Sequence, residues 1–189
     1  MNRRDALSRV ALLVGGTVVG AEFFLSGCTA AEKKAAGLPL TKEDIAYLDE
    51  IAETIIPATD TPGAKAAKVG EFMNTMVTDC YTEADQKIFL EGMGKLNEAC
   101  NKAHGHDFMK ASPEHRKELL TALDKEAKEY SKNKKKEDPN HYFSLMKQLT
   151  LLGFFTSETG ATKTLRYIQV PGRYEGCVPY KKGDKAWAT

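Results

Sequence analysis

Four helix-start signals, each followed by apolar residues at helical spacing, constrain the fold of this chain more than any other feature. Thr41 and Thr82 each stand three residues before an aspartate, which is the pattern of a capping box. Ser112 and Asp138 each precede a proline, a residue favoured in the first turn of a helix. Strand-like alternation is scarce between these signals, so the sequence predicts helices without a sheet.

Apolar side chains recur at intervals of three and four residues after these signals and define the expected core. The spacing predicts five helices, which begin at Thr41, near Ala66, at Thr82, at Ser112 and at Asp138. The residues expected to face inward are Ile45, Leu48, Ala52, Ile55, Val69, Phe72, Met73, Met76, Val77, Ile88, Phe89, Met93, Leu96, Cys100, Leu119, Leu120, Leu123, Ala127, Tyr130, Tyr142, Leu145, Met146, Leu149 and Leu152. The predicted fold is all-α, a single small bundle over residues 41–160.

The composition changes after Phe155. Residues 156–160 have turn character, and residues 161–189 combine Gly, Pro and aromatic side chains without a helical or strand period. This segment lacks the periodic apolar residues needed to fold alone, yet it is too aromatic for simple disorder. We therefore expect an irregular, extended C-terminal arm that packs either against its own helices or against a partner protein.

Residues 1–27 have the pattern of a secretory signal, with a basic start followed by a short uncharged apolar stretch. The apolar stretch is too short to span a bilayer. Arg3 and Arg4 resemble a twin-arginine signal, which sends folded proteins across the membrane. The leader predicts an exported protein.

Leu-Ser-Gly before Cys28 resembles the lipobox of bacterial lipoproteins, in which the cysteine is acylated and becomes the new N-terminus. Residues 28–40 would then form a lipidated tether to the helical domain, because they are rich in small residues and lysine. The prediction is a lipoprotein of the cell envelope that faces the periplasm and binds the membrane through its lipid anchor. Cleavage near residues 29–31 would instead release a soluble protein.

Composition excludes several classes of function. Removal of residues 1–27 takes away three Arg, one Asp and one Glu, which leaves 24 basic and 24 acidic side chains. The absence of net charge gives no indication that the chain binds nucleic acid. The sequence contains no Gly-rich phosphate loop and no GxSxG elbow. We therefore expect no catalytic residues and no cofactor bound by this chain alone.

Cysteine and histidine positions offer few candidate ligands for a metal. Cys80, Cys100 and Cys177 remain besides Cys28, and their odd number allows at most one internal disulfide, whose members the sequence does not identify. No Cys spacing is typical of a metal site. His104 and His106 flank a glycine and are weak candidates for a metal site, and a polar loop between helices is the favoured interpretation of both.

Three stretches carry a resemblance to a known family. They are residues 53–64, with Ile-Ile-Pro-Ala-Thr-Asp-Thr-Pro-Gly at their centre, residues 149–160, which end in Thr-Ser-Glu-Thr-Gly, and residues 167–179, which contain Val-Pro-Gly-Arg-Tyr. Together with the leader, their order resembles the gluconate 2-dehydrogenase subunit 3 family, the small subunit of membrane-associated flavoprotein dehydrogenases.

The resemblance implies a partner. The family's large subunit is a flavoprotein of the glucose–methanol–choline oxidoreductase class, which binds FAD and oxidises a sugar or sugar acid. The small subunit is expected to be a non-catalytic escort that stabilises its partner during export, and here the lipobox would also tether the complex to a membrane. The contact residues expected are Thr59, Asp60, Thr61, Pro62, Gly63, Ser157, Glu158, Gly160, Tyr167, Pro171, Gly172, Arg173, Tyr174 and Trp187.

Two other functions fit the same residues. A stand-alone lipoprotein of the cell envelope could bind a small ligand or a surface component. An enzyme in its own right could work through a metal held by His104 and His106. The sequence does not identify the sugar, the electron acceptor, the membrane or the stoichiometry.

Overall fold

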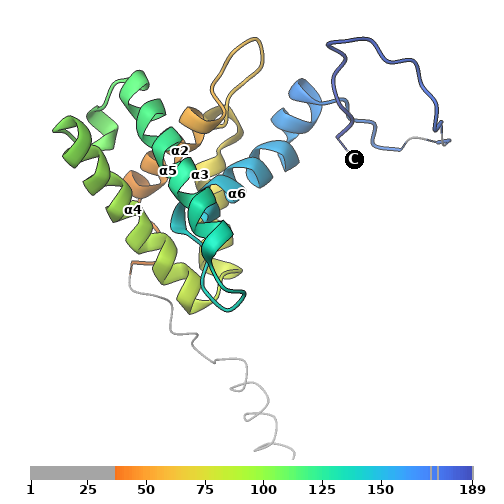
Figure 1. The fold of residues 1–189 in the computed structure, drawn as a ribbon. Coiled ribbons are helices and arrows are strands. Elements are labelled where there is room, and N and C mark those ends of the chain that lie inside the picture. Colours follow the sequence, from red (N-terminus) through yellow and green to blue (C-terminus); the bar gives the residue numbers. More distant parts are fainter. Residues whose placement is uncertain (1–36, 171, 174, 189) are drawn as a thin grey trace, which may run out of the picture. The chain divides into compact units, whose positions relative to one another are not determined.

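The structure, a computed structural model, describes residues 37–170, 172–173 and 175–188. It is an all-α bundle, as predicted (Figure 1). The helices are α2 (Lys42–Ile55), α3 (Val69–Asp79), α4 (Glu83–His104), α5 (Pro113–Asn133) and α6 (Tyr142–Thr156), with the short turns η1 (Lys65–Ala67), η2 (Phe108–Lys110) and η3 (Gly160–Thr164). Extended pairing within the described residues is limited to one parallel bridge between Arg166 and Trp187. The predicted leader and Cys28 lie outside the described residues.

Three of the four predicted helix starts are confirmed. Thr41 accepts the backbone N–H of Asp44 and receives the reciprocal contact, so the capping box is complete. Thr82 accepts the backbone N–H of Asp85 at 3.2 Å. Ser112 caps α5, with a proline in its first turn. These caps satisfy N–H groups that have no partner inside the helix, which explains why local sequence alone located them.

The predicted start at Asp138 is wrong. The Asp138 carboxylate accepts the backbone N–H of Lys135 at 2.8 Å, so it closes a turn between helices. Helix α6 begins at Tyr142, and His141 is its N-cap, with Nδ1 accepting the backbone N–H of Phe143 at 3.2 Å. Aspartate followed by proline favours a turn as readily as a helix start, and here the turn is formed.

The predicted second helix is interrupted at Lys68, whose backbone is left-handed with φ of +53°. This residue separates η1 from α3. The Asp49 carboxylate reaches across from α2 and accepts the backbone N–H of Gly70 at 2.7 Å. A Cβ at Gly70 would lie 2.6 Å from the Ile45 carbonyl oxygen, so α3 begins where its backbone presses against α2. The interruption therefore comes from packing between helices.

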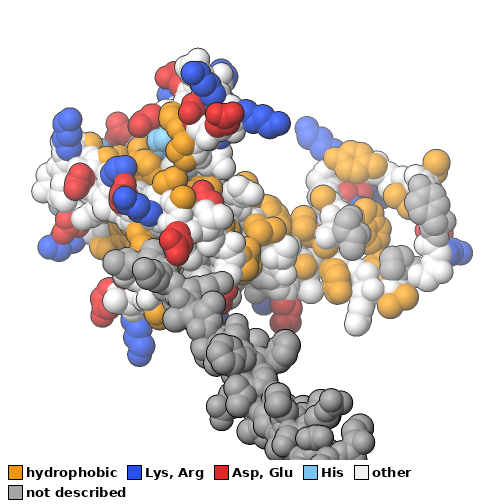
Figure 2. All heavy atoms as spheres, turned by 90° about the horizontal axis from the view of Figure 1, so that it is seen from below, with side chains coloured by type: hydrophobic (Ala, Val, Ile, Leu, Met, Phe, Trp, Pro, Cys, Tyr) orange, Lys and Arg blue, Asp and Glu red, His pale blue; other side chains and the backbone are white. Residues whose placement is uncertain are grey.

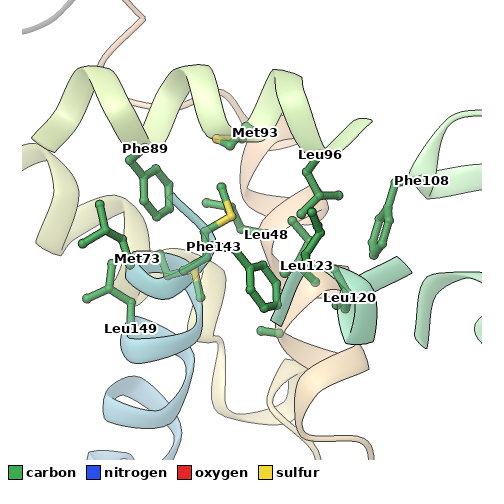
Figure 3. Packing of buried hydrophobic residues seen from close by; sticks show 14 of the residues in the cluster. Leu48, Met73, Phe89, Met93, Leu96, Phe108, Leu120, Leu123, Phe143 and Leu149 are labelled. Carbon is green, nitrogen blue, oxygen red and sulfur yellow. The ribbon is translucent and has the colours of Figure 1, made fainter. Parts of the chain in front are cut away.

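The core lies where α2, α3, α4 and α5 meet α6, which contacts each of the other four. Figure 3 shows Phe89, Met93 and Leu96 of α4 pointing toward side chains of the other helices. Most predicted core residues are buried or partly buried, but Tyr130 and Leu152 are exposed. Sequence reasoning missed seven apolar residues that are also buried, namely Leu40, Ile51, Ala64, Phe108, Ala111, Phe143 and Phe154.

Two glycines let helices approach α6 closely. A Cβ at Gly92 of α4 would lie 2.5 Å from the Cβ of Tyr142. A Cβ at Gly153 of α6 would lie 2.6 Å from the ring of Phe72 on α3. The positions of α3 and α4 against α6 therefore depend on the absence of side chains at these sites. Among the described helices, none has the length and apolar character required to cross a membrane.

Candidate partner interface

The C-terminal half of α6 is apolar on two opposite sides. Its inward side carries Leu149, Gly153 and Phe154, all buried in the core. Its outward side carries Leu151, Leu152 and Phe155, which are 41%, 42% and 39% exposed. With Gln148 these residues follow the i, i+3, i+4, i+7 spacing of a single helix face. We call Leu151, Leu152 and Phe155 the outward stripe.

The outward stripe is unusual for a helix of this kind. A helix that is apolar all round is normally buried on every side. Leu151 also lines an open groove of about 460 Å³ between α5 and α6, together with Ala127 and Ser144. One wall of this groove carries Asp124, which pairs with Lys128 at 2.7 Å and with Lys147 at 2.5 Å. The apolar surface of the outward stripe therefore continues at Leu151 into this groove.

The predicted turn after α6 is formed at Ser157, where the backbone is extended, and the chain is helical again from Glu158. Ser157 donates its hydroxyl to the Phe154 carbonyl at 2.6 Å and accepts the backbone N–H of Gly160 at 3.0 Å. The chain then continues into η3. A Cβ at Gly160 would overlap the Phe154 carbonyl oxygen, so this position requires glycine. Ser157 and Gly160 thus have structural roles, whereas Glu158 is exposed.

The arm is closed at its base. Arg166 donates its backbone N–H to the Ala186 carbonyl and accepts the N–H of Ala188, both at 2.8 Å. Its guanidinium lies 4.4 Å from the ring centre of Trp187. We call this pairing the Arg166–Trp187 clasp, and we call residues 167–185, which it encloses, the arm loop. In Figure 1 the chain can be followed from α6 into this loop and back toward its own start.

Apolar side chains of the arm are exposed to solvent. The exposed fractions range from 45% to 77% for Tyr167, Ile168, Val170, Val178, Tyr180 and Trp187. Figure 2 shows hydrophobic side chains spread over this part of the molecule. Gly172 has a left-handed φ of +74°, and Arg173 is exposed and pairs with Glu175 at 2.5 Å. Pro171 and Tyr174, two predicted contact residues, lie outside the described residues.

Charge is distributed unevenly between the helices and the arm. Residues 165–189 carry five basic and two acidic side chains, so their net charge is +3. Residues 37–164 carry 17 basic and 21 acidic side chains, so their net charge is −4. The overall net charge of +1 therefore conceals a basic arm attached to an acidic helical part.

The predicted contact loop, residues 59–63, is held in place by hydrogen bonds to Glu53. The Glu53 carboxylate accepts the backbone N–H groups of Ala58 at 2.9 Å and Lys65 at 2.8 Å. Gly63 is buried, and a Cβ there would overlap that carboxylate. Gly63 therefore shapes the loop. The other four predicted contact residues of this loop are exposed or half-buried, namely Thr59, Asp60, Thr61 and Pro62.

A second carboxylate of α2 joins the same region to α5. Glu50 pairs with Lys65 and, at 2.6 Å, with Arg116. Arg116 also donates to the carbonyl oxygens of Phe108 and Met109. Burial raises the pKa of the Glu50 carboxyl, but the hydrogen bonds and charges of Lys65 and Arg116 outweigh burial and lower that pKa below its usual 4.5. This network is structural, since it joins α2, η2 and α5.

His104 and His106 lie near a third histidine, His115. His115 is half-buried, its Nδ1 has no hydrogen-bond partner, and its ring stacks on that of His104 with centroids 4.2 Å apart. The ring of His106 lies 5.7 Å from that of His115. In the described part of the chain, no group of three or more His, Cys, Asp or Glu side chains is arranged to hold a metal ion.

Cysteines in the described residues are free thiols. Cys80 and Cys177 are exposed, and Cys100 is buried in the core. Burial raises the pKa of the Cys100 thiol. The sequence allowed one internal pair, and the structure forms none among these three.

Comparison with known proteins gives one result. The profile of the gluconate 2-dehydrogenase subunit 3 family matches residues 42–172. The chain belongs to this family. As a member of the gluconate 2-dehydrogenase subunit 3 family, it is an accessory subunit with a dehydrogenase partner. No curated protein and no solved structure matches the chain.

The family match covers the helical part and the start of the arm. Two of the resembling stretches, residues 53–64 and 149–160, lie inside the matched range, and the third is matched as far as Gly172. Sequence reasoning missed the outward stripe and the role of Arg166. The unbroken apolar run at residues 151–155 was the available signal for the stripe. No local pattern signals the clasp.

Proposed function

We propose that this chain is the non-catalytic small subunit of an FAD-dependent sugar or sugar-acid dehydrogenase of the glucose–methanol–choline class. It binds its partner, stabilises it and escorts it during export, while FAD and the reacting groups belong to the partner. The observation that carries the proposal is the family match, which makes the chain a dehydrogenase subunit.

The exposed surface supports this role. The outward stripe and the arm loop leave several large apolar side chains in contact with water. Extended exposed apolar surface on a folded chain marks a site of protein interaction, because covering it releases water from apolar groups. Tyr, Trp and Arg, which the arm supplies at Tyr167, Trp187 and Arg166, are enriched in the cores of such interfaces.

The leader gives the escort role a physical basis. Twin-arginine export passes folded cargo, so one leader on the small subunit can carry a complex that already holds its flavin. Acylation of Cys28 would then hold the exported complex at a membrane, with residues 29–40 as the linker.

Co-expression of the full chain with its dehydrogenase tests the proposal. The tag is placed on the dehydrogenase, and we expect the small subunit to co-purify with a protein that shows oxidised-flavin absorbance. Replacing Arg3 and Arg4 by lysine should retain both subunits in the cytoplasm. Cys28→Ser should release the exported complex from membranes. A monodisperse exported chain that never associates with a flavoprotein would instead support a stand-alone lipoprotein.

Deletion of residues 171–189 tests the contribution of the arm. We expect the shortened chain to lose co-purification with the flavoprotein, because the exposed apolar residues Val178, Tyr180 and Trp187 are removed. The control is Thr121→Ala, since Thr121 is an exposed residue of α5 remote in sequence from the arm. Unchanged co-purification of the deletion variant would show that the arm is not part of the interface.

A further inference from the structure

The outward stripe and the arm loop share two properties that set them apart from the other described surfaces. Both expose large apolar side chains, and the chain passes from one to the other through a single short turn, η3. The arm loop also carries the basic excess of a chain whose helical part is acidic. An apolar surface bordered by one sign of charge selects a partner of complementary character.

We propose that the outward stripe and the arm loop form one docking surface, and that its occupant is an apolar patch of the dehydrogenase subunit bordered by carboxylates. This inference rests on the proposed function and adds to it the place and chemistry of the contact. The side chains that would meet the carboxylates are Arg173, Lys181, Lys182 and Lys185. Leu151, Leu152 and Phe155 would meet the apolar patch.

The arm loop has a defined shape before any partner binds. Asp184 accepts the backbone N–H of Lys181 at 2.9 Å and donates its own N–H to the Lys181 carbonyl at 3.0 Å. Gly183, with φ of +97°, completes this turn. The Arg166–Trp187 clasp closes the loop at its base. A shaped loop loses less conformational entropy on binding than a free tail would, which favours recognition of one protein surface over a lipid surface.

Arg166 is a positioning residue in this arrangement. Its backbone forms both hydrogen bonds of the bridge, and its guanidinium covers the indole of Trp187. Trp187 is the sole tryptophan of the chain, so its fluorescence reports the clasp directly. In the free full chain, Arg166→Ala should shift the emission to longer wavelength and raise the rate of proteolysis within the arm loop, and Arg166→Lys should restore part of both. An unchanged spectrum and unchanged proteolysis would overturn the clasp.

Binding of the dehydrogenase to the full chain is then measured over a range of salt concentrations. Wild-type affinity should fall as salt rises, because exposed charges are screened. The double variant Lys181→Glu, Lys182→Glu should lose about tenfold in affinity and much of the salt dependence. The matched control is Lys135→Glu, Lys136→Glu, which reverses the same charge on exposed residues outside the docking surface and should bind as wild type does.

The apolar half of the surface is tested separately. Leu152→Ser with Phe155→Ser should lower affinity about tenfold or more while the salt dependence stays as in wild type. Equal binding by these variants and by wild type would overturn the docking surface alone. Failure of wild type to bind any dehydrogenase would overturn the proposed function.

Two other occupants would be revealed by the same variants. The first is a membrane, tested by binding of the Cys28→Ser chain to vesicles of anionic lipid. If Lys181→Glu, Lys182→Glu abolishes vesicle binding but retains dehydrogenase binding, the arm loop binds a membrane and the proposal is overturned. The second is another copy of this chain, tested by sedimentation. If the chain self-associates, and Lys181→Glu, Lys182→Glu abolishes self-association but retains dehydrogenase binding, the arm loop binds a second copy and the proposal is also overturned.

Discussion

Single side chains on α2 determine the shape of the segment that follows it. Glu53 binds both ends of the loop from Ala58 to Lys65, and Gly63 leaves room for the carboxylate. A motif that reads from sequence as turn formers is therefore organised by one acidic residue on the preceding helix. The exposed Thr59 and Asp60 are the parts of this motif that remain available for a partner.

Gly63→Ala should destabilise the chain by about 1–3 kcal/mol, because the new methyl group overlaps the Glu53 carboxylate and forces it from its two hydrogen bonds. The matched control is Gly94→Ala in α4, where no atom lies within 4 Å of the new Cβ. That change should stabilise the chain by about 0.5–1 kcal/mol, since alanine loses less backbone entropy in a helix. Urea unfolding monitored by circular dichroism measures both. Equal stability of the two variants would contradict the role of Gly63.

Glu50 predicts how stability depends on pH. Its folded-state pKa lies below its usual 4.5, so the unfolded chain takes up a proton more readily than the folded chain. The stability contributed by Glu50 is therefore complete well above pH 4.5 and is lost as the pH falls through the folded pKa. Glu50→Gln should cost about 1.5–3 kcal/mol at neutral pH, because it weakens charge-assisted bonds to Lys65 and Arg116.

The same substitution should flatten the acid limb of the stability profile, measured by urea unfolding at a series of pH values. Asp124 serves as the comparison, because hydrogen bonds from Lys128 and Lys147 lower the pKa of its carboxyl, and this residue is retained in the variant. Some loss of stability in acid should therefore persist. A Glu50→Gln profile that runs parallel to that of wild type would show that Glu50 does not contribute.

At the scale of the elements, helix α6 contributes both to the core and to the exposed apolar surface. Its inward side forms the centre of the core, and its outward stripe stays in solvent. The free chain gains nothing from the apolar character of the outward side, so this character points to a surface that is covered in a complex.

Substitution of two leucines of α6 tests these two contributions separately. Leu149→Ala should cost about 2–5 kcal/mol, because it removes buried methyl groups and leaves a cavity. Leu152→Ala should change the free energy of unfolding by no more than about 0.5 kcal/mol, because the side chain is already 42% exposed. Thermal and urea unfolding of the free chain measure both values. A large loss of stability in Leu152→Ala would mean that the outward stripe is part of the core.

At the scale of the whole molecule, an acidic helical part is followed by a basic arm. The described residues beyond Arg166 are exposed apart from Ala188, and their described hydrogen bonds connect the arm to itself and to Lys163. Stability and recognition are therefore expected to reside in different parts of the chain.

Deletion of residues 167–189 should leave the unfolding midpoint and the helical circular dichroism of the remaining chain unchanged, while tryptophan fluorescence disappears with Trp187. The control is a deletion of residues 158–189, which also removes η3 and the Ser157–Gly160 contact and should lower the midpoint. A lower midpoint in the shorter deletion would show that the arm supports the helices.

The sequence predicted those features that depend on neighbouring residues. The caps at Thr41, Thr82 and Ser112 are local hydrogen bonds, so their residue types identified them. The orientation of α6 was not predictable at Leu152, because a helix apolar on all sides gives no periodic signal for its buried face. The clasp joins Arg166 to Trp187 across the arm, and such non-local pairing has no signature in either residue alone.

Gly153 connects the buried and exposed sides of α6. Phe72 occupies the space where any other residue would place its first carbon, so the tilt and roll of α6 against α3 follow from a single missing methyl group. Because the two sides share one rigid backbone, that roll also fixes the direction in which Leu152 faces a partner. The affinity of the complex should therefore change when Gly153 is substituted, although Gly153 itself would not contact the dehydrogenase.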